Sequence, residues 1–196
     1  MIKKRNVGIL IFDSAEVLDF AGPFEVFSVT SQLNDHKLFD VFTVGEKLEP
    51  ISAVNGLSVN PKYDYTNCPQ VDILIISGGS GTRQQVENNE TLNWIRQIHK
   101  KTEFTLSICS GSRLLGVLGL LDNQPYCTHH EVYNDMMAIV PKGIPQKNKR
   151  YVNFQKTYTS GGISSGIDLS FAIVAKLHGK QIAHKTAAYM EYNSTN

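Results

Sequence analysis

The sequence predicts a single α/β domain, built as a three-layer, doubly wound sandwich around a mostly parallel sheet. Three observations support this prediction. The chain has 196 residues, which is enough for one well-buried core and short for two. Short apolar runs alternate with helical patterns along most of it, and several of these runs end in loops rich in glycine and serine. We therefore expect one domain over residues 1–196, with some antiparallel structure near a sheet edge.

Short apolar runs predict the strands of the first half. Residues 7–12, 39–44 and 71–76 are apolar over most of their length, which is typical of strands buried on both faces of a parallel sheet. Residues 51–59 instead predict a hairpin, because Asn55-Gly56 at their centre accepts the positive φ of a tight turn.

Helical patterns fill the spaces between these strands. Pro23 suits the first turn of a helix with Phe24 and Phe27 on its apolar face, which places Asp19 just before that helix. An acidic residue there is either an ordinary helix-start residue or a functional group, and its position after the first strand favours function. Apolar spacing predicts another helix at 90–101.

The second half follows the same alternation. We expect a strand at 105–108, a helix after Gly111 and another helix at 132–140. A basic solvated loop at 141–150 and a strand pair at 151–154 and 156–159 should follow. The segment 160–168 should open a helix that runs to Leu177, and residues 193–196 should form a frayed tail.

Cys109 stands where the period changes from strand to helix. Residues 105–108 are β-prone, and Leu114 and Leu115 begin a helical pattern. Gly111 lies between them and allows the backbone to make a tight turn. A residue in such a turn projects above the sheet, close to helix amides that favour thiolate over thiol. Cys109 is thus either a nucleophile or a small buried apolar residue, and this stretch alone leaves both open.

Three segments that follow strand ends are expected to meet. In doubly wound sheets, ligands collect at the carboxyl ends of the strands, where Asp19, Cys109 and the loop 77–81 all lie. That loop is either a permissive connection or a backbone surface for a ligand. It lacks the G-x-G-x-x-G and Walker patterns, so nucleotide binding is not supported.

Charge and cysteine content narrow the class of protein. With 19 basic and 18 acidic residues, the net charge of +1 gives no pull toward nucleic acid or anionic lipid, and small neutral ligands fit better. No apolar run approaches the length of a membrane span and no secretory signal is seen, so we expect a cytoplasmic protein. Cys68, Cys109 and Cys127 are an odd number without a close pair, which argues against a disulfide framework.

A run of two histidines and a glutamate, His129-His130-Glu131, suggests a metal site at first sight. Neighbouring residues on a helix point in different directions, however, and no H-x-x-x-H spacing is present. A structural or substrate-pocket use of His129 is therefore favoured over metal binding.

Several motifs together resemble the ThiJ/PfpI superfamily, within the class I glutamine amidotransferase-like group of flavodoxin-like folds. The motifs, in chain order, are Val17-Leu-Asp19-Phe-Ala-Gly-Pro23, Ile76-Ser-Gly-Gly79, Ile108-Cys-Ser-Gly-Ser112, Gly119-Leu-Leu121, Thr128-His129 and Gly161-Gly-Ile-Ser-Ser-Gly-Ile-Asp168. They span nearly the whole chain.

The resemblance is strongest to the isonitrile hydratases of this superfamily. It implies a nucleophile at Cys109, an acid/base carboxylate at Asp19 and a hydroxyl residue at 110, which is Thr in the family and Ser110 here. It also implies a homodimer that needs no metal or organic cofactor. No histidine follows Cys109, which weakens protease-like and amidotransferase-like activities, and the expected glutamate of glyoxalase-like members is replaced by Asp19.

The expected reaction adds water to an isonitrile and releases an N-substituted formamide. Cys109 attacks the carbon and protonated Asp19 supplies the proton, which requires an apolar setting that raises the pKa of Asp19. Ser110 is expected to orient Asp19 or the substrate.

A backbone and side-chain set is expected to bind the substrate or its oxyanion: Gly78, Gly79, Ser80 and His129, together with the amide of Ser110. The alternatives are a redox-sensing or small-ligand-binding domain and another cysteine-dependent hydrolase or glyoxalase-like activity.

Overall fold

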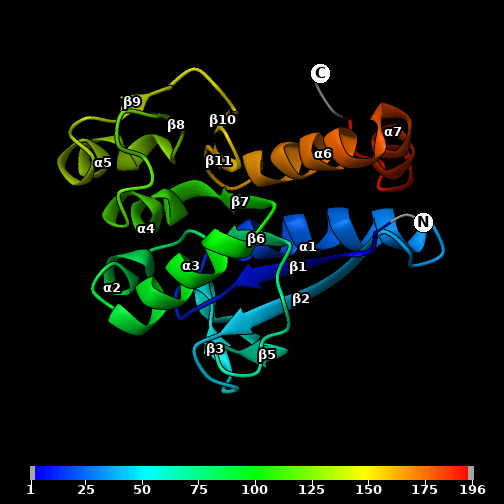
Figure 1. Cartoon of the computed structure of the whole chain (residues 1–196), viewed down its shortest axis with the longest axis horizontal. Coiled ribbons are helices and arrows are strands. Elements are labelled where there is room, and N and C mark those ends of the chain that lie inside the picture. The colour runs from blue at the N-terminus through cyan, green and yellow to red at the C-terminus, as the bar shows by residue number, and fades with distance from the viewer. Residues whose placement is uncertain (1–2, 194–196) are drawn as a thin grey trace.

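A computed structural model describes residues 3–193, so the tail expected at 193–196 lies, apart from Asn193, outside the described residues (Figure 1). The strands, in chain order, are β1 (Arg5–Leu10), β2 (Phe39–Gly45), β3 (Ile51–Ser52), β4 (Ser58–Val59), β5 (Tyr63–Asp64), β6 (Ile73–Ile76), β7 (Phe104–Ser107), β8 (Pro125–Tyr126), β9 (Ile144–Pro145), β10 (Tyr151–Phe154) and β11 (Thr157–Ser160). The α-helices are α1 (Val17–Gln32), α2 (Thr82–Gln85), α3 (Asn89–Lys101), α4 (Ser112–Val117), α5 (Tyr133–Ile139), α6 (Ser165–His178) and α7 (Lys180–Tyr189), and short 3-10 turns cover Val54–Gly56, Cys109–Gly111 and His130–Val132.

The central sheet has seven strands in the order β10-β11-β7-β6-β1-β2-β5. All of its pairs are parallel except β10 with β11, which forms the antiparallel edge. The chain goes from β1 to β2 on one side and then to β6 and β7 on the other, so β1 marks the switch point of the sheet. The predicted α/β sandwich is confirmed.

Helices cover both faces of this sheet. Figure 1 shows α1, α6 and α7 together on one side of the strands and α3 on the other, and the contacts of α1 with α6 and α7 agree with this view. Right-handed crossovers explain the arrangement, because reversing the direction of travel along the sheet moves the connecting helix to the opposite face. Strand β6, in the middle of the sheet, is apolar throughout, and all four of its residues are buried.

The hairpin prediction is confirmed, with local differences elsewhere. β3 and β4 pair antiparallel, and Asn55 and Gly56 between them have φ of 63° and 86°. Helix α7 was not predicted; it begins directly after Gly179, whose φ of 89° ends α6 and redirects the chain. The basic loop expected at 141–150 contains β9, which pairs with β8.

The placement of Asp19 before the first helix is wrong. Helix α1 begins at Val17, so Asp19 lies in its first turn and Pro23 lies in the helix interior. Proline is usually a start signal because it has no N–H to donate to the preceding turn. Here it lies six residues after the helix start, where its missing N–H removes one donor from the helix interior.

Residues 3–193 lack two features: a helix that could span a membrane and a cluster of side chains that could bind a metal. None of the helices there is both long and apolar enough to cross a lipid bilayer. Among the same residues, no group of three or more His, Cys, Asp or Glu side chains is arranged to hold a metal ion.

The core that supports the strand ends makes a direct prediction. Ile75 in β6 is fully buried, so Ile75→Ala removes apolar contacts and leaves a cavity, which lowers the free energy of unfolding by about 2–5 kcal/mol. Urea denaturation followed by circular dichroism measures this loss. Ile144→Ala is the matched control, since Ile144 is 50% exposed and its truncation is expected to change stability by less than about 0.5 kcal/mol. Equal effects at both positions would contradict the placement of the core.

Candidate active site

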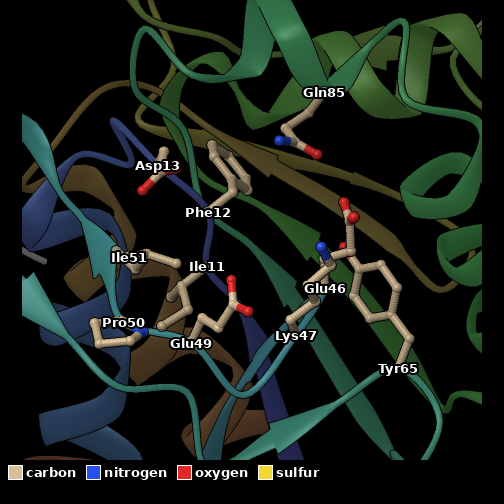
Figure 2. A pocket seen from close by; sticks show the side chains of 10 residues that line it. All are labelled: Ile11, Phe12, Asp13, Glu46, Lys47, Glu49, Pro50, Ile51, Tyr65 and Gln85. Atoms are coloured by element: carbon tan, nitrogen blue, oxygen red, sulfur yellow. The ribbon is translucent and has the colours of Figure 1, made fainter.

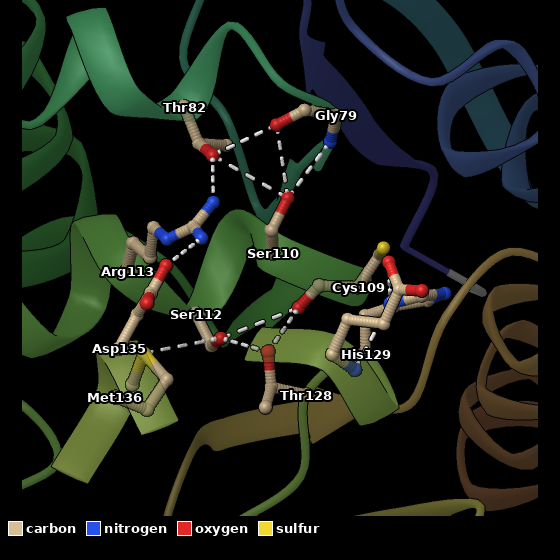
Figure 3. Close-up of polar contacts among 11 residues, drawn as sticks. Gly79, Thr82, Cys109, Ser110, Ser112, Arg113, Thr128, His129, Asp135 and Met136 are labelled. Carbon is tan, nitrogen blue, oxygen red and sulfur yellow. Dashed lines mark hydrogen bonds and ion pairs between the residues drawn. The ribbon is translucent and has the colours of Figure 1, made fainter. Parts of the chain in front are cut away.

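The backbone of Cys109 adopts a conformation that L-residues rarely use. Its φ is 54°, directly after β7, in the turn that leads into α4. The surroundings hold it there. Its N–H donates to the Gly161 carbonyl at 3.1 Å. Its carbonyl accepts from Thr128 Oγ1 at 3.0 Å and from Ser112 Oγ at 3.2 Å, as Figure 3 shows. Such backbone strain costs on the order of 1 kcal/mol or more, and where it occurs it marks a site worth functional scrutiny.

Gly78 is the point where the candidate catalytic groups meet. A Cβ atom on this residue would lie 2.6 Å from Asp19 Oδ2, 2.7 Å from the Ser110 nitrogen and 2.8 Å from Cys109 Cβ. Asp19, Ser110 and Cys109 therefore converge on one face of Gly78, and only glycine fits between them. Segments that are about 90 residues apart in the chain thus face one small space at the strand ends.

Asp19 is completely buried. Its Oδ2 accepts a hydrogen bond from the Gly78 N–H at 3.0 Å, and its Oδ1 has no hydrogen-bond partner among the described residues. Burial raises the pKa of Asp19 to about 7, the charge of Glu16 adds to this, and the Gly78 amide and the Cys109 thiol oppose it. The expected raised pKa of this carboxyl is confirmed.

The expectation of a ready thiolate at Cys109 is wrong. Burial raises the pKa of the Cys109 thiol to about 12, and the negative charge of Asp19 contributes in the same direction. The backbone amides of Ser110 and Ile163 favour the thiolate, as the position at a helix start suggested, but they are outweighed. Cys109 is only 6% exposed, and the sequence pattern did not reveal this degree of burial.

Asp19 and Cys109 therefore titrate as a pair. Between the first and second ionisations the pair carries one proton and one negative charge. That proton resides mainly on sulfur, and its transfer to Asp19 produces a thiolate beside a neutral carboxylic acid. The arrangement supplies a nucleophile and an acid in a single step, without any change in net charge.

Ser110 contacts the neighbouring loop and not Asp19. Its Oγ accepts from the Gly79 N–H at 2.9 Å and donates to the Gly79 carbonyl at 3.0 Å (Figure 3). The amides of Gly78 and Gly79 are consequently both occupied, the first by Asp19 and the second by Ser110. The expectation that these two amides face a substrate oxyanion is not met, because side chains of the protein already use them.

The two remaining predicted binding residues lie outside this cluster. Ser80 is exposed, and its carbonyl accepts from the Arg83 N–H. His129 is 21% exposed and packs against Gly162, in the loop whose preceding residue, Gly161, accepts from the Cys109 N–H. His129 is thus a neighbour of the loop that binds the backbone of Cys109.

The sequence reasoning missed Ile163 as a site residue. Its backbone amide lowers the pKa of both Asp19 and Cys109, so it faces the two groups at once. It lies in the Gly161-Gly162-Ile163 segment and has a φ of 52°. The glycine motif is visible in the sequence, but the sequence does not show that the backbone amide of Ile163, which follows the two glycines, points toward Asp19 and Cys109.

A separate pocket lies at the ends of β1 and β2. Figure 2 shows its lining by the residues that follow β1, by Glu46, Lys47 and Glu49, and by Tyr65 and Gln85; its volume is about 180 Å³. None of Asp19, Cys109 and Ser110 lines it. This pocket is therefore separate from the buried pair at Gly78.

The family is shown by a match that covers most of the chain. Residues 5–176 match the DJ-1/PfpI family. The chain belongs to the DJ-1/PfpI family. It is 30% identical to isonitrile hydratase from Pseudomonas putida over 187 residues, which are 95% of this chain and 78% of that enzyme.

Other relatives differ in overall length. The chain is 23% identical to the HTH-type transcriptional regulator GbdR from Pseudomonas aeruginosa over 91% of its own length, but it spans only about half (48%) of that regulator. Among solved structures, it is similar to a ThiJ/PfpI family protein from Pseudomonas syringae, with a TM-score of 0.88, 24% identity, and coverage of 100% of this chain and 78% of that one. It also resembles Drosophila melanogaster DJ-1beta, with a TM-score of 0.84, 15% identity, and coverage of 99% and 100%.

The buried carboxyl of this DJ-1/PfpI protein makes stability depend on pH. The folded-state pKa of Asp19 is raised, so its favourable contribution is complete below the unfolded value of 3.8 and is lost as the pH rises through about 7. Asp19→Asn removes this loss. We therefore expect the unfolding free energy of the variant, measured relative to wild type, to be a few kcal/mol higher at pH 8 than at pH 5. Urea titrations at both pH values measure it, and a difference independent of pH would contradict the raised pKa.

Proposed function

We propose that this protein hydrates isonitriles to N-substituted formamides, with Cys109 as nucleophile and Asp19 as general acid and base. The observation that carries the proposal is the buried pair: a thiol and a carboxyl that meet at Gly78 and hold one proton between them above about pH 7. An isonitrile carbon must accept both a nucleophile and a proton, and this pair offers the two from adjacent positions. The similarity to the Pseudomonas putida enzyme supports the same reaction.

The first half of the proposed reaction forms a covalent intermediate. The Cys109 proton moves to the Asp19 carboxylate, the thiolate forms a carbon–sulfur bond to the isonitrile carbon, and Asp19 returns the proton to that carbon. The product is a thioimidate, R–N=CH–S–Cys, with Asp19 again ionised. The Ile163 and Ser110 amides near the sulfur stabilise the transient thiolate.

The second half consumes water. Asp19 takes a proton from a water molecule as its oxygen bonds to the thioimidate carbon, and passes that proton to the nitrogen. The carbon–sulfur bond then breaks as the hydroxyl proton returns through Asp19 to sulfur. The result is R–NH–CHO and free Cys109, so every atom of water is accounted for without a cofactor.

The occupied amides distinguish this reaction from acyl transfer. Hydrolysis of an amide or ester needs free donors for an oxygen that becomes negative. The amides of Gly78 and Gly79 are both bonded to protein side chains. An isonitrile has no oxygen to stabilise during the first addition, so the site suits it better than a carbonyl substrate.

The alternative of a sensing domain has mixed support. The similarity to an HTH-type transcriptional regulator supports a regulatory role as the alternative. Redox sensing is disfavoured, because the raised pKa of the Cys109 thiol leaves little thiolate to react with peroxide. The cytoplasmic location and the homodimer expected from the sequence remain predictions, and light scattering of the purified protein tests the second.

An assay of formamide release from a panel of alkyl and aryl isonitriles tests the proposal. We expect Cys109→Ala to abolish turnover and Asp19→Asn to lower kcat by about 10²–10⁴-fold, since it removes the proton carrier. Wild-type kcat/KM should rise with pH through about 7, as Asp19 ionises and becomes able to accept the thiol proton. Mass spectrometry of the formamide gives the rates.

Cys127→Ala is the matched control, because Cys127 is also a buried free cysteine but lies outside the cluster at Gly78. It should retain wild-type turnover. Absence of turnover on every isonitrile, or full activity of Asp19→Asn, would reject the proposed reaction.

A further inference from the structure

Arg113 is a buried cation that the proposed chemistry does not use. It lies in α4, one turn after the nucleophile, and is only 4% exposed. Its guanidinium donates to Thr82 Oγ1 at 3.0 Å and forms an ion pair with Asp135 of α5, as Figure 3 shows. Burying an arginine is costly unless its donors are satisfied, so its two contacts identify what it holds in place.

The contact with Thr82 sets the direction of a hydrogen-bond chain. A guanidinium only donates, so the Thr82 hydroxyl must accept from Arg113 and direct its own proton elsewhere. That proton goes to the Gly79 carbonyl at 2.8 Å, the same carbonyl that accepts from Ser110 at 3.0 Å. Thr82 Oγ1 also lies 3.4 Å from Ser110 Oγ. Arg113 thereby fastens Gly79 to the turn that carries Cys109.

We propose that Arg113 is a positioning residue for the reaction: through Thr82 and Gly79 it holds the Gly78 amide against the Asp19 carboxyl. Gly78 and Gly79 are consecutive, so fixing the second fixes the direction of the first amide, which donates to Asp19 at 3.0 Å. As a statement about catalysis, this inference rests on the proposed function. As a statement about the acidity of Asp19, it is tested without any isonitrile.

The charged and polar groups that bear on Asp19 come from four segments. They are Glu16 of the chain entering α1, the Gly78 amide after β6, the Cys109 thiol after β7 and the Ile163 amide before α6. The charge of Arg113 is not among them; it faces Thr82 and Asp135. Loss of Arg113 therefore reaches Asp19 through the Gly78 hydrogen bond and not through direct charge interaction.

The pH dependence of Cys109 alkylation by iodoacetamide gives the test, with each cysteine followed separately by mass spectrometry. In wild type the rate should rise to a plateau with a midpoint near pH 7, and Asp19→Asn should remove this midpoint. Arg113→Met weakens the Gly78 hydrogen bond to the carboxylate, so the midpoint should move upward by about half a unit to one unit. Thr82→Val, which keeps the Arg113–Asp135 pair, should cause a similar shift.

Three further variants make the result specific. The double variant Arg113→Met/Thr82→Val should shift the midpoint no further than the larger single shift, because both changes break one chain. Arg113→Lys keeps a donor and should retain most of the wild-type midpoint. Arg83→Met removes an exposed arginine from the same short helix as Thr82 and should leave the midpoint unchanged.

The outcomes separate this inference from the proposed function. Upward shifts with no hydration of any isonitrile would reject the function and keep the positioning role. Wild-type midpoints in both Arg113→Met and Thr82→Val, even with lowered melting temperatures, would show that Arg113 only supports the fold. A wild-type profile without an Asp19-dependent midpoint would also overturn the inference.

Discussion

The site depends on one constraint: two acids share a buried space that tolerates only one negative charge. Burial raises the pKa of Asp19 and of Cys109, and the charge of Asp19 raises that of the thiol further. Because each ionisation suppresses the other, the pair keeps a single proton from about pH 7 to about pH 12. A proton confined between a nucleophile and an acid is useful for additions in which one atom receives both. The rest of the structure serves to keep the two groups together and away from water.

The sheet provides the rigid part of this arrangement. β6 and β7 are neighbours, and β6 lies beside β1, so the segments that follow these strands bring Gly78, Cys109 and, in the first turn of α1, Asp19 to adjacent strand ends. The strained φ of Cys109 persists because hydrogen bonds from three sides fix its peptide groups. Gly111 permits the same turn, since a Cβ there would lie 2.5 Å from the Ile76 carbonyl oxygen. Glycine and hydroxyl residues thus fix the backbone of the loops, as packing of buried aliphatic residues fixes the strands.

Sequence reasoning succeeded where a local pattern has a single structural consequence. The change of period at Cys109 predicted the turn, and alternating runs predicted the parallel sheet. It failed where the outcome depends on packing from distant segments. The thiol pKa was placed in the wrong direction because helix amides are visible in a sequence, whereas burial is not. Pro23 suggested the wrong helix start, and the amide of Ile163 carries no side-chain signal at all.

The energetic cost of the site argues for chemistry over simple binding. A receptor for a neutral molecule gains nothing from a carboxyl whose burial raises its pKa to about 7, or from a strained cysteine beside it, because both features lower the stability of the fold. An enzyme gains from both, since the shared proton and the projecting sulfur act only when a carbon atom is attacked. The same fold supports regulators and enzymes, so the fold does not decide between them. The unfavourable features gathered at Gly78 favour the proposed enzymatic role, because covalent chemistry makes use of both.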